Sequence, residues 1–234
     1  MHTSKPRVAL FDVDGVIIRG FSMLPFGRFM LRRGIIDREG WSGFYTDFED
    51  IREERVPYAQ FAENAVSHFA LALKDRSREE VLAAGKECAA SFRVFWYVRE
   101  LLQELRQHGV RTIAVSGSPE ECLLPLIGLV GLDEVHGMLM EVDSSGRYTG
   151  GVVRNLALKP VKAALARELA AQCRVVAAFG DSDQDSGMLE TAQHPFAMNA
   201  RPQLAAVAAE RGWTTLDFRH NVPRRVMEEL DAEG

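Results

Sequence analysis

Two carboxylates lie one residue apart near the start of the chain, in the stretch LFDVDGVI at residues 10–17. Asp12 and Asp14 end an apolar run and are followed by Gly15. Side chains two apart on an extended segment point to the same side, so both acids can face one site. Gly15 lets the chain turn close to a ligand. The pair fits a nucleophile with a proton donor, although an acidic turn after a strand fits it too.

Two serines follow a second apolar run, in the stretch SGS at residues 116–118. We predict that Ser118 caps a helix, because Pro119 can occupy the first helical position and Glu121 can complete a capping box. Ser116 is not needed for that cap, and the amide groups of Gly117 and Ser118 lie near it. Amides at the start of a helix suit an anion, so this stretch is a candidate phosphate site.

Two lysines lie in the stretch LKPVK at residues 158–162. Pro160 predicts the start of a helix, with Lys159 at its cap and Lys162 in its first turn. A lysine there opposes the helix dipole by about 0.3–1 kcal/mol, and an anion in front of the helix would reverse that penalty. Either lysine could hold such an anion, and a solvated surface lysine is the alternative.

Three acids lie within five residues in the stretch FGDSDQD at residues 179–185. Asp181, Asp183 and Asp185 follow an apolar run, and carboxylates are the ligands that Mg²⁺ prefers. The stretch lacks the spaced ligands and the distal glutamate of an EF-hand. Clustered carboxylates repel one another without a cation, so the sequence predicts a metal site here.

Short apolar runs predict the strands that must position these groups, at residues 8–11, 112–115, 135–139, 175–179 and 196–198. Helical patterns lie between them, which is typical of a doubly wound α/β sheet with parallel strands. The carboxyl ends of such strands meet at one edge of the sheet. We therefore expect the four motifs to converge on one site.

One region breaks the alternation of strands and helices. Residues 19–91 contain little strand signal and predict helices at 25–33, 57–73 and 78–90. A helical insert after the first strand is a candidate cap over the carboxyl ends of the strands. We expect a core domain of residues 1–18 and 92–234 and a cap domain of residues 19–91.

The length, charge and cysteine content of the chain limit the kinds of binding partner and compartment that we expect for it. The chain has 234 residues and a net charge of −5, which argues against nucleic acid or an anionic membrane as the main partner. Residues 1–7 lack an apolar signal core, and the longest apolar run, 122–132, is too short to span a bilayer. The three cysteines form no CxxC pattern, so we expect reduced thiols in a cytoplasmic protein. The oligomeric state stays open.

The order of the motifs, D-x-D-G, S-G-S, a lysine and then G-D-S-x-x-D, resembles the haloacid dehalogenase superfamily of phosphohydrolases. The stretch GRYTGG at 146–151 is similar to the phosphoserine-phosphatase-like branch, subfamily IB, as are DSGML, MNARPQL and AAERGWTTL in the last third of the chain. The resemblance covers about residues 7–18 and 95–217. The insert matches a C1-type cap only in position and helical character.

The resemblance implies a Mg²⁺-dependent phosphomonoester hydrolase and a role for each motif. Asp12 would attack phosphorus to form an aspartyl-phosphate, and Asp14 would act as acid and then base. The phosphoryl oxygens would be held by Ser116, Gly117 and Lys162. Mg²⁺ would be bound by Asp12, the main-chain carbonyl of Asp14 and Asp181, with support from Asp185. The spacing favours Lys162 for the lysine, and Lys159 remains the alternative.

The substrate is less well indicated than the reaction. Phosphoserine phosphatases usually carry an acid shortly after the first motif, whereas this chain has Arg19 there and no acid until Asp37. A small phosphorylated metabolite is expected, with phosphoserine itself as an alternative. Arg28 and Arg32, four residues apart, could meet a second anionic group or form a solvated face.

Several aromatic residues of the insert could line an apolar pocket or fill the interior of the cap, namely Phe21, Phe26, Phe29 and Trp41. Two other functions use similar groups. A phosphotransferase would differ only in the alcohol that accepts the phosphoryl group. A phospho-accepting signalling domain is disfavoured, because it needs no helical cap and the metal-loop acids here follow the lysine.

Overall fold

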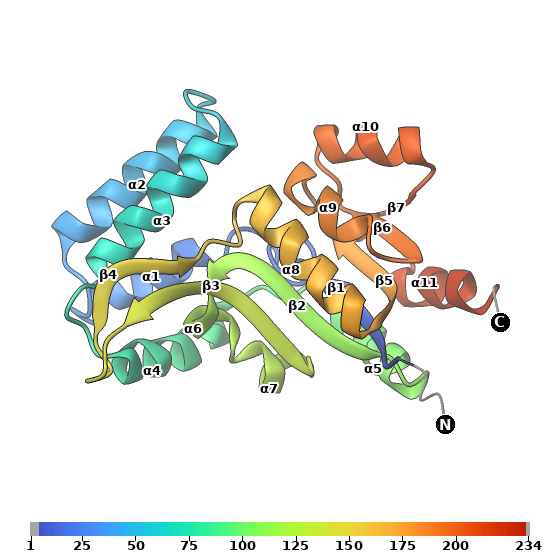
Figure 1. Ribbon diagram of the computed structural model, residues 1–234, viewed down its shortest axis with the longest axis horizontal. Helices are drawn as coiled ribbons and strands as arrows, with labels where there is room; N and C mark the ends of the chain where they lie inside the picture. Colours follow the sequence, from blue (N-terminus) through green and yellow to red (C-terminus); the bar gives the residue numbers. More distant parts are fainter. Residues whose placement is uncertain (1–4, 233–234) are drawn as a thin grey trace.

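The computed structural model describes residues 5–232, and a seven-stranded sheet runs through its centre in the order β4-β3-β2-β1-β5-β6-β7 (Figure 1). The first four residues, part of the segment expected to lack a signal core, lie outside the described residues. The strands are β1 (Arg7–Phe11), β2 (Arg111–Pro119), β3 (Glu134–Val142), β4 (Tyr148–Arg154), β5 (Arg174–Gly180), β6 (His194–Met198) and β7 (Thr214–Leu216). Only β3 and β4 pair antiparallel among the described strands.

Helices cover both faces of this sheet and form a separate group beyond its β4 end. The core helices are α5 (Val98–Gln107), α6 (Glu120–Leu123), α7 (Leu126–Val130), α8 (Lys159–Gln172), α9 (Ser186–Leu189), α10 (Pro202–Arg211) and α11 (Val222–Asp231). The inserted helices are α1 (Met23–Arg32), α2 (Arg38–Arg52), α3 (Tyr58–Ala72) and α4 (Arg78–Cys88). Short 3₁₀ turns lie at Ala89–Ser91 and Asp183–Asp185.

The central strand β1 shows why the sheet is covered on both sides. Val8 and Leu10 join an apolar cluster with α8, α9 and α10, whereas Ala9 and Phe11 join a cluster with α5, α7 and α11. Alternate residues of a strand point to opposite faces, so an unbroken apolar run needs two covering layers. The doubly wound α/β fold that the sequence predicts is confirmed.

The five predicted strands are all present, and two strands were not predicted. β4 contains Gly150 at φ +90° and the adjoining Gly151, which weaken any strand pattern. β7 is only three residues long. The apolar run 122–132 forms the short helices α6 and α7. Within residues 5–232, no helix has both the length and the apolar character needed to cross a membrane.

The inserted region contains one helix more than the sequence predicts. α2 begins after Asp37, whose carboxylate accepts a hydrogen bond from the amide of Gly40 at 2.7 Å. Gly40 and Gly43 face α3: a Cβ at Gly40 would lie 3.0 Å from Ala72, and one at Gly43 would lie 2.9 Å from the ring of His68. The two glycines therefore let α2 and α3 approach closely, but glycines also lower the helix propensity read from sequence.

We propose the division of the chain into a core and a cap of residues 19–91. The two connections between these parts lie side by side, because the amide of Arg19 donates to the carbonyl of Arg93 at 2.7 Å. The cap has its own apolar cluster, built on residues such as Phe26 and Phe44. That cluster also includes Met138 of β3 and Tyr148 of β4, so the cap rests on the β3–β4 hairpin.

Candidate active site

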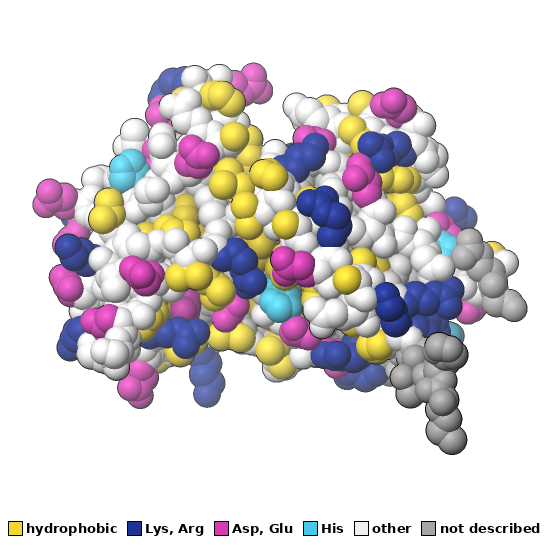
Figure 2. Space-filling view, viewed as in Figure 1, with side chains coloured by type: hydrophobic (Ala, Val, Ile, Leu, Met, Phe, Trp, Pro, Cys, Tyr) yellow, Lys and Arg dark blue, Asp and Glu magenta, His cyan; other side chains and the backbone are white. Residues whose placement is uncertain are grey.

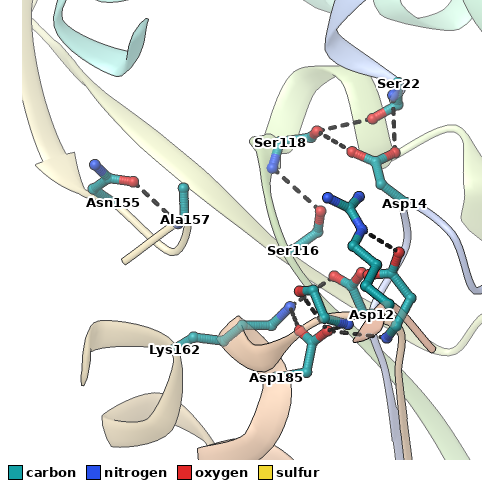
Figure 3. Close-up of polar contacts among 12 residues, drawn as sticks. Asp12, Asp14, Ser22, Ser116, Ser118, Asn155, Ala157, Lys162 and Asp185 are labelled. Carbon is teal, nitrogen blue, oxygen red and sulfur yellow. Dashed lines mark hydrogen bonds and ion pairs between the residues drawn. The ribbon is translucent and has the colours of Figure 1, made fainter. Parts of the chain in front are cut away.

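A buried lysine joins two of the predicted carboxylates at the carboxyl end of the sheet (Figure 3). Lys162, in the first turn of α8, places Nζ 2.7 Å from Oδ1 of Asp12 and 2.6 Å from Oδ1 of Asp185. Burial alone lowers the pKa of Lys162, but the two carboxylates raise it above its ordinary value. Lys162 therefore stays charged at the centre of the cluster.

Asp12 directly follows β1, and its amide donates to the carbonyl of Phe179 on β5 at 2.8 Å. This backbone bond holds Asp12 beside the loop that follows β5. Burial and the neighbouring charge of Asp185 raise the pKa of Asp12 well above its ordinary value, while Lys162 opposes the shift. Asp12 therefore combines a buried carboxylate with a single close cation.

The loop after β5 is organised by Asp185. Its Oδ2 accepts hydrogen bonds from the amide of Asp181 at 3.1 Å and from the amide and hydroxyl of Ser182 at 3.0 and 3.1 Å. A Cβ at Gly180 would lie 2.4 Å from that of Asp185, so the tight turn requires glycine there. Both oxygens of Asp185 are thus engaged by protein groups, which suits support of the site rather than direct ligation.

The carboxylates of Asp12, Asp181 and Asp185 lie close together, and Asp12 and Asp181 are the two that fit as ligands of a hard divalent cation. Each offers an oxygen within 4.8 Å of the others, and all three side chains are buried. Burial, followed by the charge of Asp185, raises the pKa of Asp181 to about 6. Buried carboxylates so close together need compensating charge, and Mg²⁺ binds through a few carboxylates while keeping several waters. Asp12 and Asp181 therefore fit the predicted metal, with Asp185 as their support.

Asp14 lies in a short chain of hydrogen bonds that connects it with both the cap and the core (Figure 3). Its Oδ1 accepts from the amide of Ser22 at 2.8 Å, and its Oδ2 accepts from the hydroxyl of Ser118 at 3.0 Å. The hydroxyl of Ser22 donates to that of Ser118 at 2.8 Å. Burial raises the pKa of Asp14, and the bonds from Ser22 and Ser118 counteract that rise.

The helix-cap prediction for Ser118 was wrong. β2 continues through Pro119, and α6 is a single turn without a side-chain cap. The hydroxyl of Ser118 donates to Asp14 instead. Glu121 is buried and paired with Arg78 at 3.2 Å. The reason is tertiary: a local pattern cannot show that a carboxylate from the first strand reaches the same hydroxyl.

The predicted phosphate loop after β2 is narrow and closely packed. The hydroxyl of Ser116 accepts a hydrogen bond from the amide of Ser118 at 3.2 Å. A Cβ at Gly117 would lie only 2.8 Å from Cα of Ala157, so the loop before α8 packs directly on the glycine. Asn155 shapes that loop by accepting from the amide of Ala157 at 3.0 Å.

The structure places Lys162, and not Lys159, in the acidic cluster. Lys159 points to Asp183, at 2.9 Å, and both side chains are partly exposed to solvent. The helix begins at Lys159, one residue earlier than the sequence predicts, with Pro160 in its first turn. Asp183 is therefore the one acid of the FGDSDQD stretch that lies outside the site.

Two polar residues of the site were not singled out from the sequence. Asn199 has a left-handed backbone, at φ +48°, and its Nδ2 donates to the carbonyl of Gly15 at 2.7 Å, next to Asp14. Arg201 donates through Nε to Oδ2 of Asp181 at 3.2 Å. Both lie in the MNARPQL stretch that carried the family resemblance, and no spacing rule connects that stretch with the first motif.

A cavity of about 620 Å³ opens above these groups, between the cap and the core. Figure 2 shows hydrophobic side chains along the hollow between the two upper lobes of the molecule. Phe21 lines this cavity, whereas Phe26 and Trp41 are buried in the cap cluster. The cavity lining does not include Phe29 or the arginines considered from the sequence, Arg19, Arg28 and Arg32.

Comparison with known proteins identifies the family. A family model described as haloacid dehalogenase-like hydrolase matches residues 9–190. The chain therefore belongs to the haloacid dehalogenase-like hydrolases, and it is an enzyme. Within this family its similarity is to phosphatases of the phosphoserine-phosphatase-like branch, as the motifs predicted.

The individual relatives and solved structures compared below share only 20–27% sequence identity with this chain. The chain is 26% identical to a histidinol-phosphatase of Neisseria meningitidis over 91% of its own length and 99% of that protein. It is 27% identical to a phosphoserine phosphatase of Mycobacterium tuberculosis, over 90% of its own length and 70% of that protein. Among solved structures, a Bordetella pertussis protein of unknown function has a TM-score of 0.74 at 21% identity, covering 92% of this chain and all of that one. A phospho-aspartyl intermediate analogue of phosphoserine phosphatase has a TM-score of 0.65 at 20% identity, covering 97% and 99%.

Proposed function

We propose that the chain is a Mg²⁺-dependent phosphomonoester hydrolase that works through an aspartyl-phosphate on Asp12 and acts on a small phosphorylated molecule. One observation carries the proposal. A buried Lys162 lies between Asp12 and Asp185, next to Asp181, on the floor of a cavity that the cap covers. Phosphate monoesters hydrolyse extremely slowly without a catalyst, so splitting the reaction at a carboxylate nucleophile has a large benefit.

In the first step a carboxylate oxygen of Asp12 forms a bond to phosphorus while the bond from phosphorus to the leaving oxygen breaks. Among the described residues, Oδ2 of Asp12 receives no hydrogen bond, so it is the oxygen available for attack. Lys162 holds the other oxygen and balances the charge that accumulates on the phosphoryl group. Ser116 and the backbone around Gly117, which line the same cavity, would hold the remaining phosphoryl oxygens.

Asp14 moves the protons in this scheme. It donates a proton to the leaving alcohol oxygen and then takes one from the water that attacks phosphorus and releases Asp12. Burial favours the protonated form that the first step needs. Ser22 and Ser118 bond to its two oxygens and hold the carboxyl in place for both steps.

The metal would be held by Asp12, by Asp181 and by the main-chain carbonyl of Asp14. When bound, Mg²⁺ supplies positive charge that polarises the phosphoryl group. Asp185 fixes the amide of Asp181 and the ammonium of Lys162, so it aligns the residues around the cation.

The three cysteines are free thiols, which supports the proposal that the enzyme works in the reducing cytoplasm.

Replacing the nucleophile tests the proposal. Asp12→Asn should lower phosphate release from phosphomonoesters to background, because the amide is a poor nucleophile. The variant should still fold, which a cooperative thermal melt above the assay temperature would show. Asp231→Asn, at the exposed end of α11, is the matched control and should keep full activity. Full activity of Asp12→Asn would contradict the mechanism.

A further inference from the structure

The cavity has two chemically different halves. Its floor carries the polar motif residues, including Asp12, Ser116 and Lys162. Its cap side is almost entirely apolar, lined by Phe21, Met23, Leu24, Phe44, Phe48, Ile51, Phe61, Ala62, Ala65 and Val66, with the ring of Tyr58 among them. Phe21, Phe48 and Ile51 are only partly buried where they face this space. The cap half would receive the alcohol part of an ester, and it is therefore an apolar surface that is partly exposed in the cavity.

Acidic side chains line this cavity only at the catalytic floor. Of the described lining residues, the acids are Asp12, Asp14, Asp181 and Asp185. Lys162, Arg201 or hydrogen-bonding serines already engage each of them. The cap half offers no carboxylate for a substrate cation.

The basic residues of the cavity are also engaged. Arg52, at the rim, lies 2.5 Å from Glu49 and 3.4 Å from Glu53, and more than half of its side chain is exposed. Arg201 is paired with Asp181. Among the described lining residues, Arg52 is therefore the one charged side chain of the cap half, and it already has two carboxylate partners.

Physical chemistry then determines which alcohols fit. An ammonium group in this half would lose water without gaining a carboxylate, which is strongly unfavourable. An aromatic or branched alkyl group would instead cover the exposed rings and gain from the removal of apolar surface from water. Discrimination by a hydrophobic pocket is on the order of tenfold or more for a group of this kind.

We infer that the substrate is a phosphate monoester whose alcohol carries a bulky, uncharged apolar group and no ammonium group. The inference rests on the proposed phosphatase function and goes beyond it. It separates this chain from the two relatives named above, because phosphoserine and histidinol phosphate both carry an ammonium group. The structural cause is the apolar pair of Phe21 and Phe48, whose rings stack at 5.8 Å between centroids in the cavity wall.

A matched pair of esters tests the inference directly. Phenylpropyl phosphate and its amino derivative, phenylalaninol phosphate, differ only by the ammonium group, and propyl phosphate lacks the ring. With Mg²⁺ present, kcat/KM for phenylpropyl phosphate should exceed that of each of the other two by roughly tenfold or more. An equal or greater value for phenylalaninol phosphate would overturn the inference and leave the phosphatase function intact. If Mg²⁺ binds and no phosphomonoester is hydrolysed, the proposed function itself fails.

A variant reverses the preference if the inference is correct. Phe21→Glu places a carboxylate in the cap half, one residue before Ser22, and should raise the ratio of kcat/KM for phenylalaninol phosphate over phenylpropyl phosphate by roughly tenfold. Leu71→Glu, on the exposed face of α3 and outside the cavity lining, is the matched control and should leave the ratio unchanged. An unchanged ratio in a Phe21→Glu protein that melts normally would contradict the assignment. The ester pair tests the wild-type chain even if this variant fails to fold.

Discussion

The ammonium of Lys162 and the carboxylate of Asp185 lie 2.6 Å apart, and less than 5% of each side chain is exposed. Asp185 also accepts three hydrogen bonds from Asp181 and Ser182, so one residue positions both the cation and the loop. The same lysine reaches Asp12, which directly follows β1. The ion pair therefore links α8, the loop after β5 and the end of β1, which are far apart in sequence.

Removing this buried ion pair should cost considerable stability. Asp185→Asn leaves Lys162 without half of its compensating charge, and breaking a buried pair typically costs about 3–5 kcal/mol. We expect a decrease of that size in the free energy of unfolding, measured by denaturant titration, together with loss of phosphatase activity. Asp183→Asn is the control, because its pair with Lys159 is partly exposed and should contribute about 0–1 kcal/mol. Equal effects of the two variants would contradict this account.

The hydroxyl of Ser118 should matter for the rate more than for the fold. Ser118→Ala removes one of the two hydrogen bonds that hold Asp14, and a bond to a charged group contributes about 1.5–3 kcal/mol. We expect kcat to fall by tenfold or more, and the melting temperature to fall by about 2–4 °C for each kcal/mol of stability that is lost. Ser118→Thr keeps the hydroxyl and should recover most of the rate. An alanine variant with wild-type kcat would show that Asp14 does not need this donor.

Gly117 should tolerate no side chain, because a Cβ there would lie 2.8 Å from Cα of Ala157. Gly117→Ala must displace the backbone of one of the two loops, and overpacking of this kind typically costs about 1–3 kcal/mol. We expect lower stability and a large loss of kcat/KM. Gly128→Ala in α7 meets open space and should be neutral or slightly stabilising. Thermal melts and phosphate release measure both variants.

A divalent cation should stabilise the folded protein. Three buried carboxylates offer oxygens within 4.8 Å of one another, so a bound cation removes their repulsion in the folded state only. At a hundredfold excess of Mg²⁺ over its dissociation constant, the gain is about 2.7 kcal/mol. The melting temperature should rise with Mg²⁺, fall again on chelation, and not respond in Asp181→Asn. A response to Mg²⁺ that survives this substitution would place the metal elsewhere.

The sequence predicts the core strands and the convergence of Asp12, Lys162 and Asp181 because each of these residues follows a short apolar run or begins a helix. These signals are local, so they can be read from the sequence without knowledge of how the strands are arranged in the sheet. α2 was missed because Gly40 and Gly43 serve contacts with α3 rather than the helix itself. Ser118 was misassigned and Arg201 was overlooked for a related reason. Their partners, Asp14 and Asp181, lie 104 and 20 residues away, and only the folded chain brings them together.

Asn155 makes two hydrogen bonds with its side-chain amide. Its oxygen holds the amide of Ala157, beside Gly117, and its nitrogen donates to the carbonyl of Ala62 on the cap helix α3 at 3.1 Å. A movement of the cap away from the core would break the second bond and free the side chain that shapes the loop before α8, which packs on Gly117. We therefore expect the position of the cap and the packing of the loops around Gly117 to depend on each other through this one side chain.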